Sequence, residues 1–339
     1  MRFSFALGLA IAGGAAVLFA GCSNGQSPGL TSGLPGSGVA PAQSRSSHAF
    51  ILRSGVDTRY AALQPAAVIS RVQPQAVPAK DLFVSDGGGT VQILKNKTYQ
   101  NVGAITNGID DSDGLWVDKA GNLYVANVLG KNVTEYAPGS SSPKCTYASG
   151  LVDPINVTTD GKGNVYIADF NNLNNPGYVD KYKQCNDKIV KQYTVSQGPE
   201  GIAVDAHNNL FVAFFNTNFN GGFEEFKGGK TIATPLSVTV GSPGGLVLDR
   251  KGNLIADDQS GSIAVIAPPY TTATVLVSGL TDPFHDSLNK AETLLFSANF
   301  GSKTVTVYKY PSGTLVTTLG SGNGLSAAEG VSDSPDAVF

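Results

Sequence analysis

The sequence predicts an all-β protein, a six-bladed β-propeller of four-stranded blades, closed by its C-terminal strand and preceded by a disordered N-terminal tether. Three observations support this prediction. One strand-like unit recurs six times at a regular spacing, and a tight-turn motif precedes most of its copies. The composition of the 339-residue chain also suits many short strands and turns, with 41 glycines but one methionine and one tryptophan.

The first 22 residues are typical of an export signal. Arg2 is followed by an apolar and small run, residues 3–20, which is too short for a comfortable transmembrane helix. Residues 18–22, Leu-Phe-Ala-Gly-Cys, resemble the bacterial lipobox, whose cysteine is acylated and becomes the mature N-terminus. The resemblance implies lipidation of Cys22 and attachment to a membrane through it. Because Ser23 follows instead of Asp, it also implies the outer membrane, on its periplasmic or surface face; an ordinary secretory signal with a chance cysteine is the alternative.

Residues 23–79 are expected to form a disordered linker. They are rich in Ser, Gly, Pro, Ala and Gln and show little hydrophobic periodicity. A short element at residues 48–52 or 60–69, packed on the following domain, is the alternative. Prolines at positions 65, 74 and 78 leave little room for it.

From residue 80 onward the chain repeats. A strand-like unit of apolar and small residues recurs, and its copies end 41, 42, 45, 44 and 41 residues apart. Six copies at this period are typical of a propeller with one copy in each blade. The copies are residues 82–86, 123–127, 165–169, 210–214, 254–258 and 295–299.

Three further strands are expected around each copy. A turn that begins with Asp and ends with Asn precedes most copies, at residues 118–122, 160–164, 205–209 and 249–253. Asp can accept hydrogen bonds from nearby backbone amides, and Gly and Asn tolerate positive φ, so this pattern suits a tight hairpin. A short strand before each turn, a third strand after each copy and a weaker fourth strand complete the blade.

The two ends of the repeat region complete each other. The first repeat starts at Asp81 and has no first strand before the recurring unit. The C-terminus, in contrast, supplies a spare segment at residues 329–333. We therefore predict that the C-terminal strand becomes the innermost strand of the first blade. This pairing would close the ring and leave no free sheet edge.

Residues 113–127 and 199–205 resemble NHL-type repeats. They are also similar to the wider group of six-bladed propellers that includes the SMP-30/gluconolactonase family. The resemblance covers residues 80–339 and implies an NHL-like propeller over that range. It implies little about activity, because the fold hosts lactonases, lyases, receptor modules and scaffolds.

Composition and motifs argue against several function classes. The formal net charge is −3 and 14% of residues are charged, which argues against nucleic acid as a partner, because that requires clustered positive charge. The chain has only three histidines, and no Gly-x-Ser-x-Gly elbow stands on a predicted strand-to-helix junction, which argues against Ser-His-Asp catalysis. The glycines lie in predicted turns and precede no helix that could cradle a phosphate.

The resemblance to SMP-30-like lactonases implies a candidate metal site at the mouth of the channel. In that family a divalent ion is held by carboxylate and Asn side chains of the innermost strands. The matching positions here could hold calcium, manganese or zinc through oxygen donors and one imidazole, although Gly244 leaves a gap. The alternative is that polar side chains only line a wet channel. The candidate ligands are Asp113, Asn156, Glu200, His285, Asp286 and Glu329.

Two cysteines remain besides Cys22, and an even pair in an exported protein favours a disulfide over a metal site. Cys145 begins the outer strand of one predicted blade, and Cys185 follows the third strand of the next. Both therefore belong near the outer rim of adjacent blades, and we predict that they are bonded. Two unpaired thiols are the alternative.

Two adjacent blades are expected to carry long loops, at residues 170–178 and 215–222. Long loops on a rigid scaffold are where binding residues concentrate, and amide and aromatic side chains suit sugars or peptides. The alternative is that Asn serves the turns and the aromatic residues cap the blade cores. The candidate binding residues are Phe170, Asn172, Asn175, Tyr178, Phe215, Asn218 and Phe219.

The expected function is that of an exported, lipid-anchored and monomeric propeller that binds or scaffolds a protein or glycan partner. The alternative is a metal-dependent hydrolase or lactonase of the SMP-30 type, with its site at the channel mouth. A purely scaffolding repeat protein is a third possibility. The lack of a complete lactonase motif favours a protein that is not an enzyme, and no cofactor other than a divalent cation is suggested.

Overall fold

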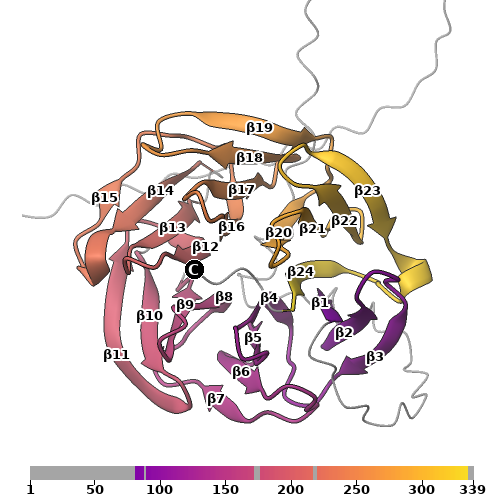
Figure 1. Cartoon of the computed structure of the whole chain (residues 1–339). Coiled ribbons are helices and arrows are strands. Elements are labelled where there is room, and N and C mark those ends of the chain that lie inside the picture. Colours follow the sequence, from indigo (N-terminus) through magenta and orange to yellow (C-terminus); the bar gives the residue numbers. More distant parts are fainter. Residues whose placement is uncertain (1–80, 88, 172–175, 217–219, 335–339) are drawn as a thin grey trace, which may run out of the picture. The chain divides into compact units, whose positions relative to one another are not determined.

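A computed structural model describes residues 81–87, 89–171, 176–216 and 220–334. They form six four-stranded antiparallel sheets arranged as blades in a ring, which confirms the predicted fold class (Figure 1). The helical elements in these ranges are two short 3-10 turns, η1 (Lys227–Gly229) and η2 (Ser321–Asn323). Neither has the length or apolar character to cross a bilayer. Cys22, the predicted signal and the predicted linker lie outside the described residues.

Each blade has its innermost strand at the channel and its fourth strand at the rim (Figure 1). Blade 1 contains β24 (Ala328–Asp333), β1 (Asp81–Asp86), β2 (Thr90–Lys95) and β3 (Asn101–Ile105). Blade 2 contains β4 (Ser112–Val117), β5 (Leu123–Asn127), β6 (Asn132–Tyr136) and β7 (Cys145–Tyr147). Blade 3 contains β8 (Pro154–Thr159), β9 (Asn164–Asp169), β10 (Gly177–Lys183) and β11 (Asn186–Val195).

The second half of the ring follows the same order. Blade 4 contains β12 (Gly198–Val204), β13 (Leu210–Phe215), β14 (Gly221–Phe226) and β15 (Thr234–Pro235). Blade 5 contains β16 (Pro243–Leu248), β17 (Leu254–Asp258), β18 (Ser262–Ile266) and β19 (Ala273–Ser278). Blade 6 contains β20 (Pro283–Leu288), β21 (Leu294–Asn299), β22 (Thr304–Lys309) and β23 (Thr314–Leu319).

The ring is closed by the C-terminal strand, as predicted. β24 pairs antiparallel with β1, so that Leu82 lies opposite Asp333 and Val84 opposite Val331. The first blade is therefore built from the two ends of the repeat region. Its innermost strand is paired in the same way as those of the other blades, and the edge of β1 is covered.

The blades give the ring two different faces. We call the hairpin face the one that carries the connections from first to second and from third to fourth strands. The mouth face carries the connections from second to third strands and from each blade to the next. β1 is the second strand of its blade and begins at Asp81, beside the end of β24, so both ends of the described chain lie at the hairpin face.

The repeated turns on the hairpin face are stabilised by their aspartates. Asp118 Oδ1 accepts the backbone N–H groups of Ala120 and Asn122 at 2.8 Å, and its Oδ2 accepts the side-chain amide of Asn122. Asp160, Asp205 and Asp249 repeat this pattern. The carboxylates therefore stabilise the hairpin turns by accepting hydrogen bonds from them, as the sequence predicts.

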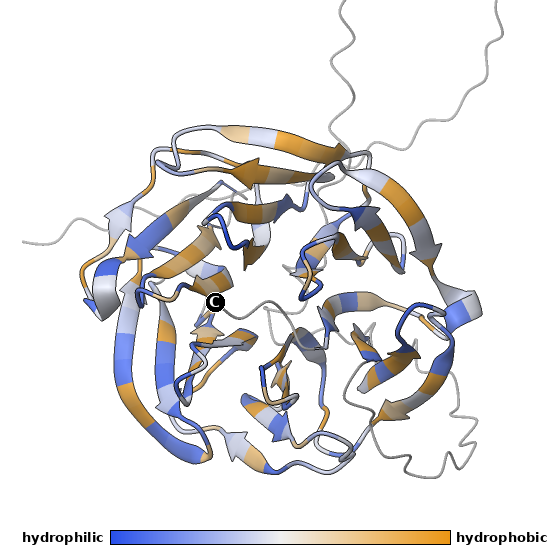
Figure 2. Cartoon of the chain, in the orientation of Figure 1, coloured by the Kyte–Doolittle hydropathy of each residue, from blue (hydrophilic) through white to orange (hydrophobic). Residues whose placement is uncertain are grey.

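The hydrophobic core lies between neighbouring blades. Phe83 and Ile93 of blade 1, for example, pack with Val117 and Tyr136 of blade 2. Inner strands such as β1, β8 and β9 are buried along their whole length, as expected for sheets packed on both faces. Figure 2 shows the apolar residues of the strands. Blade 4 departs from the regular pattern, because its fourth strand is reduced to Thr234–Pro235.

The predicted disulfide is present and links the rims of blades 2 and 3. The Cα atoms of Cys145 and Cys185 are 5.2 Å apart. Beside it the fully buried carboxylate of Glu135 accepts hydrogen bonds from Lys144 Nζ at 2.9 Å and from the Tyr147 hydroxyl at 2.6 Å. The bond therefore adds a covalent link between two blades that also meet through hydrogen bonds, such as the one from the backbone N–H of Cys185 to the Tyr147 hydroxyl at 2.9 Å.

Candidate functional site: the central channel

The six innermost strands share one irregularity at the channel. In each of them the pairing with the second strand shifts register, which leaves a bulge next to the mouth face. Bulges re-aim side chains and are common beside functional sites. The first residues of the six bulges, from blade 1 to blade 6, are Glu329, Asp113, Ile155, Glu200, Gly244 and Phe284.

The next position along these strands is glycine in four blades. These are Gly330, Gly114, Gly201 and Gly245, and each brings its strand close to the innermost strand of the following blade. A Cβ atom on Gly201 would lie 2.5 Å from the carbonyl oxygen of Gly244. The glycines therefore allow the tight packing of strands around the channel.

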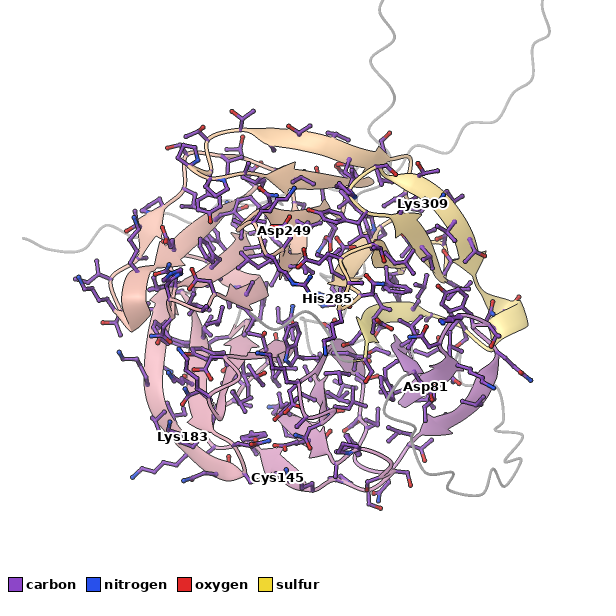
Figure 3. The ribbon with its side chains drawn as sticks, viewed as in Figure 1. Asp81, Cys145, Lys183, Asp249, His285 and Lys309 are labelled. Atoms are coloured by element: carbon purple, nitrogen blue, oxygen red, sulfur yellow. A yellow bond between two sulfur atoms is a disulfide. The ribbon has the colours of Figure 1, made fainter. Side chains whose placement is uncertain are left out.

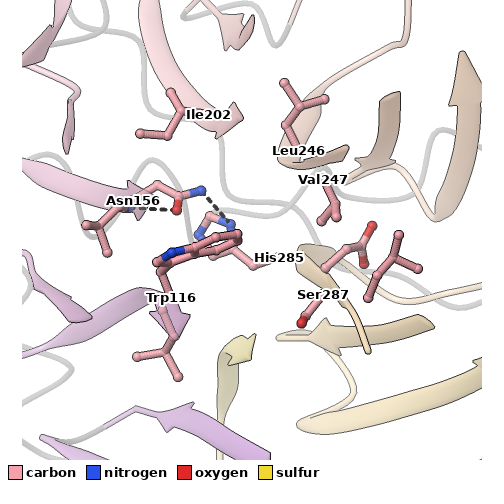
Figure 4. Close-up of a pocket in the computed structure, with 11 residues that line it drawn as sticks. Trp116, Asn156, Ile202, Leu246, Val247, His285 and Ser287 are labelled. Carbon is pink, nitrogen blue, oxygen red and sulfur yellow. Dashed lines mark hydrogen bonds between the residues drawn. The ribbon is translucent and has the colours of Figure 1, made fainter. Parts of the chain in front are cut away.

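In the two remaining blades, which face each other across the ring, this position carries Asn156 and His285. Their side chains meet in the channel, with Asn156 Nδ2 3.3 Å from His285 Nδ1 (Figure 4). Asn156 Oδ1 accepts the backbone N–H of Val157 at 2.7 Å, which orients the amide so that its NH₂ group donates to His285. His285 Nε2 then donates to Asp113 Oδ1 at 2.9 Å. This buried bridge joins blades 2, 3 and 6 across the channel axis.

A pair of carboxylates lies on the other side of the channel, in blades 5 and 6. The carboxylate of Asp257 occupies the space where a side chain on Gly244 would lie. Its two oxygens accept the backbone N–H groups of Gly244 and Gly245 at 3.1 and 2.8 Å. Burial, reinforced by the charge of Asp286, raises the pKa of Asp257 well above its usual range. Burial also raises the pKa of Asp286 to about 7, and the hydroxyl of Ser297 opposes this rise.

A small cavity lies within the channel. Its volume is about 30 Å³, enough for one or two water molecules, whereas pockets for small organic ligands usually exceed about 300 Å³. Asn156, His285 and Asp286 contribute its polar lining, and Trp116 lies beside the Asn156–His285 contact (Figure 4). The cavity as arranged can hold water or a small ion.

The predicted metal ligands converge only in part. Asp113, Asn156 and His285 meet, but both ring nitrogens of His285 are engaged with the other two residues. Glu200 and Glu329 are fully buried at the channel. Among the described residues, one group brings three ligand atoms of His, Cys, Asp or Glu within 4.8 Å of one another. It consists of Glu135 and the two disulfide cysteines, which lie at the rim and not at the channel. The described channel residues therefore bring no three His, Cys, Asp or Glu ligand atoms within 4.8 Å of one another, and the metal and the lactonase stay predictions.

The two long connections are found on the mouth face of blades 3 and 4. The connection of blade 3 spans the seven residues 170–176. That of blade 4 is shorter than predicted, because β13 and β14 extend into it and leave the five residues 216–220. The other second-to-third connections have three or four residues and span 87–89, 128–131, 259–261 and 300–303. Phe170 and Phe215 are fully buried, with ring centroids 5.8 Å apart, so they cap the blade cores instead of facing a ligand. Tyr178 is half-buried. The remaining candidates, Asn172, Asn175, Asn218 and Phe219, lie outside the described residues.

Sequence reasoning missed Asp257, although a signal for it exists. Its position in the recurring unit carries a small residue in the other five copies: Ser85, Ala126, Ala168, Ala213 and Ala298. Asp286 is exceptional in the same way, because the matching residues of the innermost strands are Val331, Leu115, Val157, Ile202 and Leu246. Aligning the copies by position would have brought out both carboxylates.

Comparisons with known proteins support the fold. No protein-family model and no curated protein matches this sequence. A structure titled as a nidogen/laminin complex is similar, with a TM-score of 0.61 and 17% identity over 75% of this chain and 98% of that one. A functionally unknown protein from Desulfotomaculum acetoxidans gives a TM-score of 0.55 and 16% identity, covering 74% of this chain and 98% of that chain. Hydrazine synthase from Kuenenia stuttgartiensis gives 0.57 and 14%, covering 80% and 93%.

Proposed function

We propose that this chain is an exported, lipid-anchored propeller of the NHL-like kind that binds a protein or glycan partner through its mouth face. The observation that carries the proposal is the seven-residue connection 170–176 of blade 3, which lies beside the five-residue connection 216–220 of blade 4 on that face. Phe170 and Phe215 at their bases pack against each other, so the two connections start from one rigid platform. Loops of unusual length on such a platform are where partner contacts concentrate.

The arrangement of the channel favours binding over catalysis. Asp113, Asn156 and His285 are hydrogen-bonded to one another across the axis, and the cavity beside them has a volume of about 30 Å³. A substrate the size of a sugar lactone would therefore need these contacts to open. The structure titled as a nidogen/laminin complex, one of the similar folds, is a complex between proteins and is in keeping with a binding role.

The partner face can be tested by replacing each long connection with a four-residue turn. We expect both variants to fold and to lose a partner identified with the unaltered protein by pull-down or on a glycan array. Exchanging residues 300–303 of blade 6 for an unrelated turn of the same length is the matched control, and it should keep the binding. A partner that binds both shortened variants as well as the unaltered chain would rule this face out.

The lipid anchor, and with it the proposed outer-membrane location, is tested separately. Cells labelled with a fatty acid should incorporate it into the unaltered protein and not into Cys22→Ala. The unaltered protein should fractionate with the outer membrane. An unlabelled protein released into the medium would refute the anchor and leave the proposed binding face standing.

A further inference from the structure

The charged residues are divided unevenly between the interior and the surface. Of the acidic residues in the described ranges, only Asp110 and Asp187 are fully exposed, because most carboxylates face the channel or serve the turns. The lysines and the arginine, in contrast, are nearly all exposed. The exposed charged side chains are therefore mostly basic, although the formal net charge of the chain is −3.

These basic residues gather on the hairpin face. On the mouth face, the second-to-third connections of the described chain carry only Lys131 and Lys303. On the hairpin face, Lys183 and Lys309 end third strands and lie at opposite sides of the ring (Figure 3). The exposed basic residues of this face are Lys95, Lys97, Lys119, Lys144, Lys162, Lys183, Lys188, Lys227, Lys230, Arg250, Lys251, Lys290 and Lys309.

The hairpin face also carries acidic residues, but few of them are exposed. The turn carboxylates Asp118, Asp160, Asp205 and Asp249 accept hydrogen bonds from their own turns, and all but Asp205 are buried. Glu135, Glu225 and Glu292 form ion pairs with Lys144, Lys227 and Arg250. The exposed Asp187 accepts the backbone N–H groups of residues 148 and 149. The other exposed lysines of the face have no carboxylate of the described residues within 4.0 Å. This set contains Lys119, Lys162, Lys183, Lys251, Lys290 and Lys309.

The basic residues are spread over turns around the ring instead of lining a groove. Lys119, Lys162, Lys251 and Lys290 project from the first hairpins of blades 2, 3, 5 and 6. Such a distribution suits a flat anionic surface better than a single extended polymer. The described chain also begins at Asp81 on this face, so the residues that precede it join the propeller there.

We propose that the hairpin face rests on a lipid surface and binds the phosphates of its anionic headgroups. The proposal deepens the function proposed above and rests on the lipid anchor at Cys22. The anchor holds the propeller near the bilayer, the basic turns orient it, and the mouth face with the two long connections points away. Basic residues near a bilayer are attracted to anionic headgroups, which adds an orienting contribution to that of the anchor.

Vesicle binding of the mature chain from Ser23 onward tests this face without the anchor. This chain lacks the acylated cysteine and keeps every described strand. Co-sedimentation is measured with vesicles of phosphatidylcholine alone and with vesicles that also contain phosphatidylglycerol. We expect binding to the anionic vesicles only, and binding that weakens as salt screens the charges.

Two matched variants locate the binding. Lys162→Glu with Lys251→Glu changes the hairpin face, and Lys131→Glu with Lys303→Glu changes the mouth face by the same charge. All four lysines are exposed, so circular dichroism should show an unchanged fold for both variants. The first pair should weaken binding to anionic vesicles by about tenfold or more, and the second by about twofold or less.

Three outcomes would overturn the proposal: no binding to anionic vesicles, equal binding to neutral vesicles, or equal losses in the two variants. Binding to soluble heparin with no binding to vesicles would assign the face to an anionic polymer instead. Failure of the anchor is recognised separately, because it shows as an unacylated Cys22 and does not change the vesicle result.

Discussion

Replacing Asp286 with leucine tests whether the channel carboxylates cost the protein stability. Asp286 is buried, and the other five blades carry Val, Leu or Ile at the same position. Its neighbour Asp257 adds a second buried carboxylate. Leucine should fill the site with apolar volume and remove a charge that burial disfavours.

The magnitude and the sign follow from the pKa of Asp286, which burial raises from 3.8 to about 7. One pKa unit corresponds to about 1.4 kcal/mol, so this rise means that ionised Asp286 lowers the free energy of unfolding by on the order of 4 kcal/mol. Between pH 4 and 7 the folded protein keeps a proton that the unfolded chain has lost. The contribution of this group is therefore most favourable below pH 4, declines as the pH rises to 7 and stays constant above.

Urea unfolding at pH 8 and pH 5 measures this effect. Asp286→Leu should be more stable than the unaltered protein at pH 8 by a few kcal/mol, and this advantage should shrink at pH 5. Asp286→Asn is the control, because it removes the charge without adding apolar volume and should show the same change with pH. A variant that is equally or less stable at pH 8, with an unchanged pH dependence, would refute the reasoning.

Three further predictions concern the frame of the propeller. Cys145→Ser with Cys185→Ser opens a link with a sequence separation of 40 residues, and denaturant unfolding should show a loss of about 3 to 4 kcal/mol that reductant reproduces in the unaltered protein. Gly201→Ala should cost about 1 to 3 kcal/mol in the same assay because its Cβ meets the backbone of blade 5, whereas Gly322→Ala, which points into open space, should change little. A chain that ends at residue 325 lacks β24 and exposes the edge of β1, so sedimentation should show self-association; a cooperative monomer would contradict the closure argument.

The fold was accessible to sequence reasoning because it is repeated. Each of the six copies of the recurring unit became the second strand of a blade, and the spare segment near Glu329 became β24. The disulfide followed from the placement of its cysteines on neighbouring rims. A repeat gives several independent chances to recognise the same strand order, so errors at single positions matter little.

The candidate site was less accessible because it depends on departures from the repeat. Asp113, Asn156 and His285 were recognised as channel residues, but the hydrogen bonds that join them depend on which blades face each other. Phe170 and Phe215 were expected to be binding candidates and are buried, since residues at the ends of second strands pack between blades. Asp257 was missed because it comes from a second strand instead of an innermost strand.

The pairing of β24 with β1 also sets a condition on when the protein can fold. The first blade needs residues from both ends of the propeller, so its sheet cannot be completed until residue 333 has been synthesised. Contacts between such distant segments make folding slow, because the long intervening chain must be ordered first. The ring of such a chain therefore stays open throughout synthesis, and the first blade is completed only after the last repeat has been made.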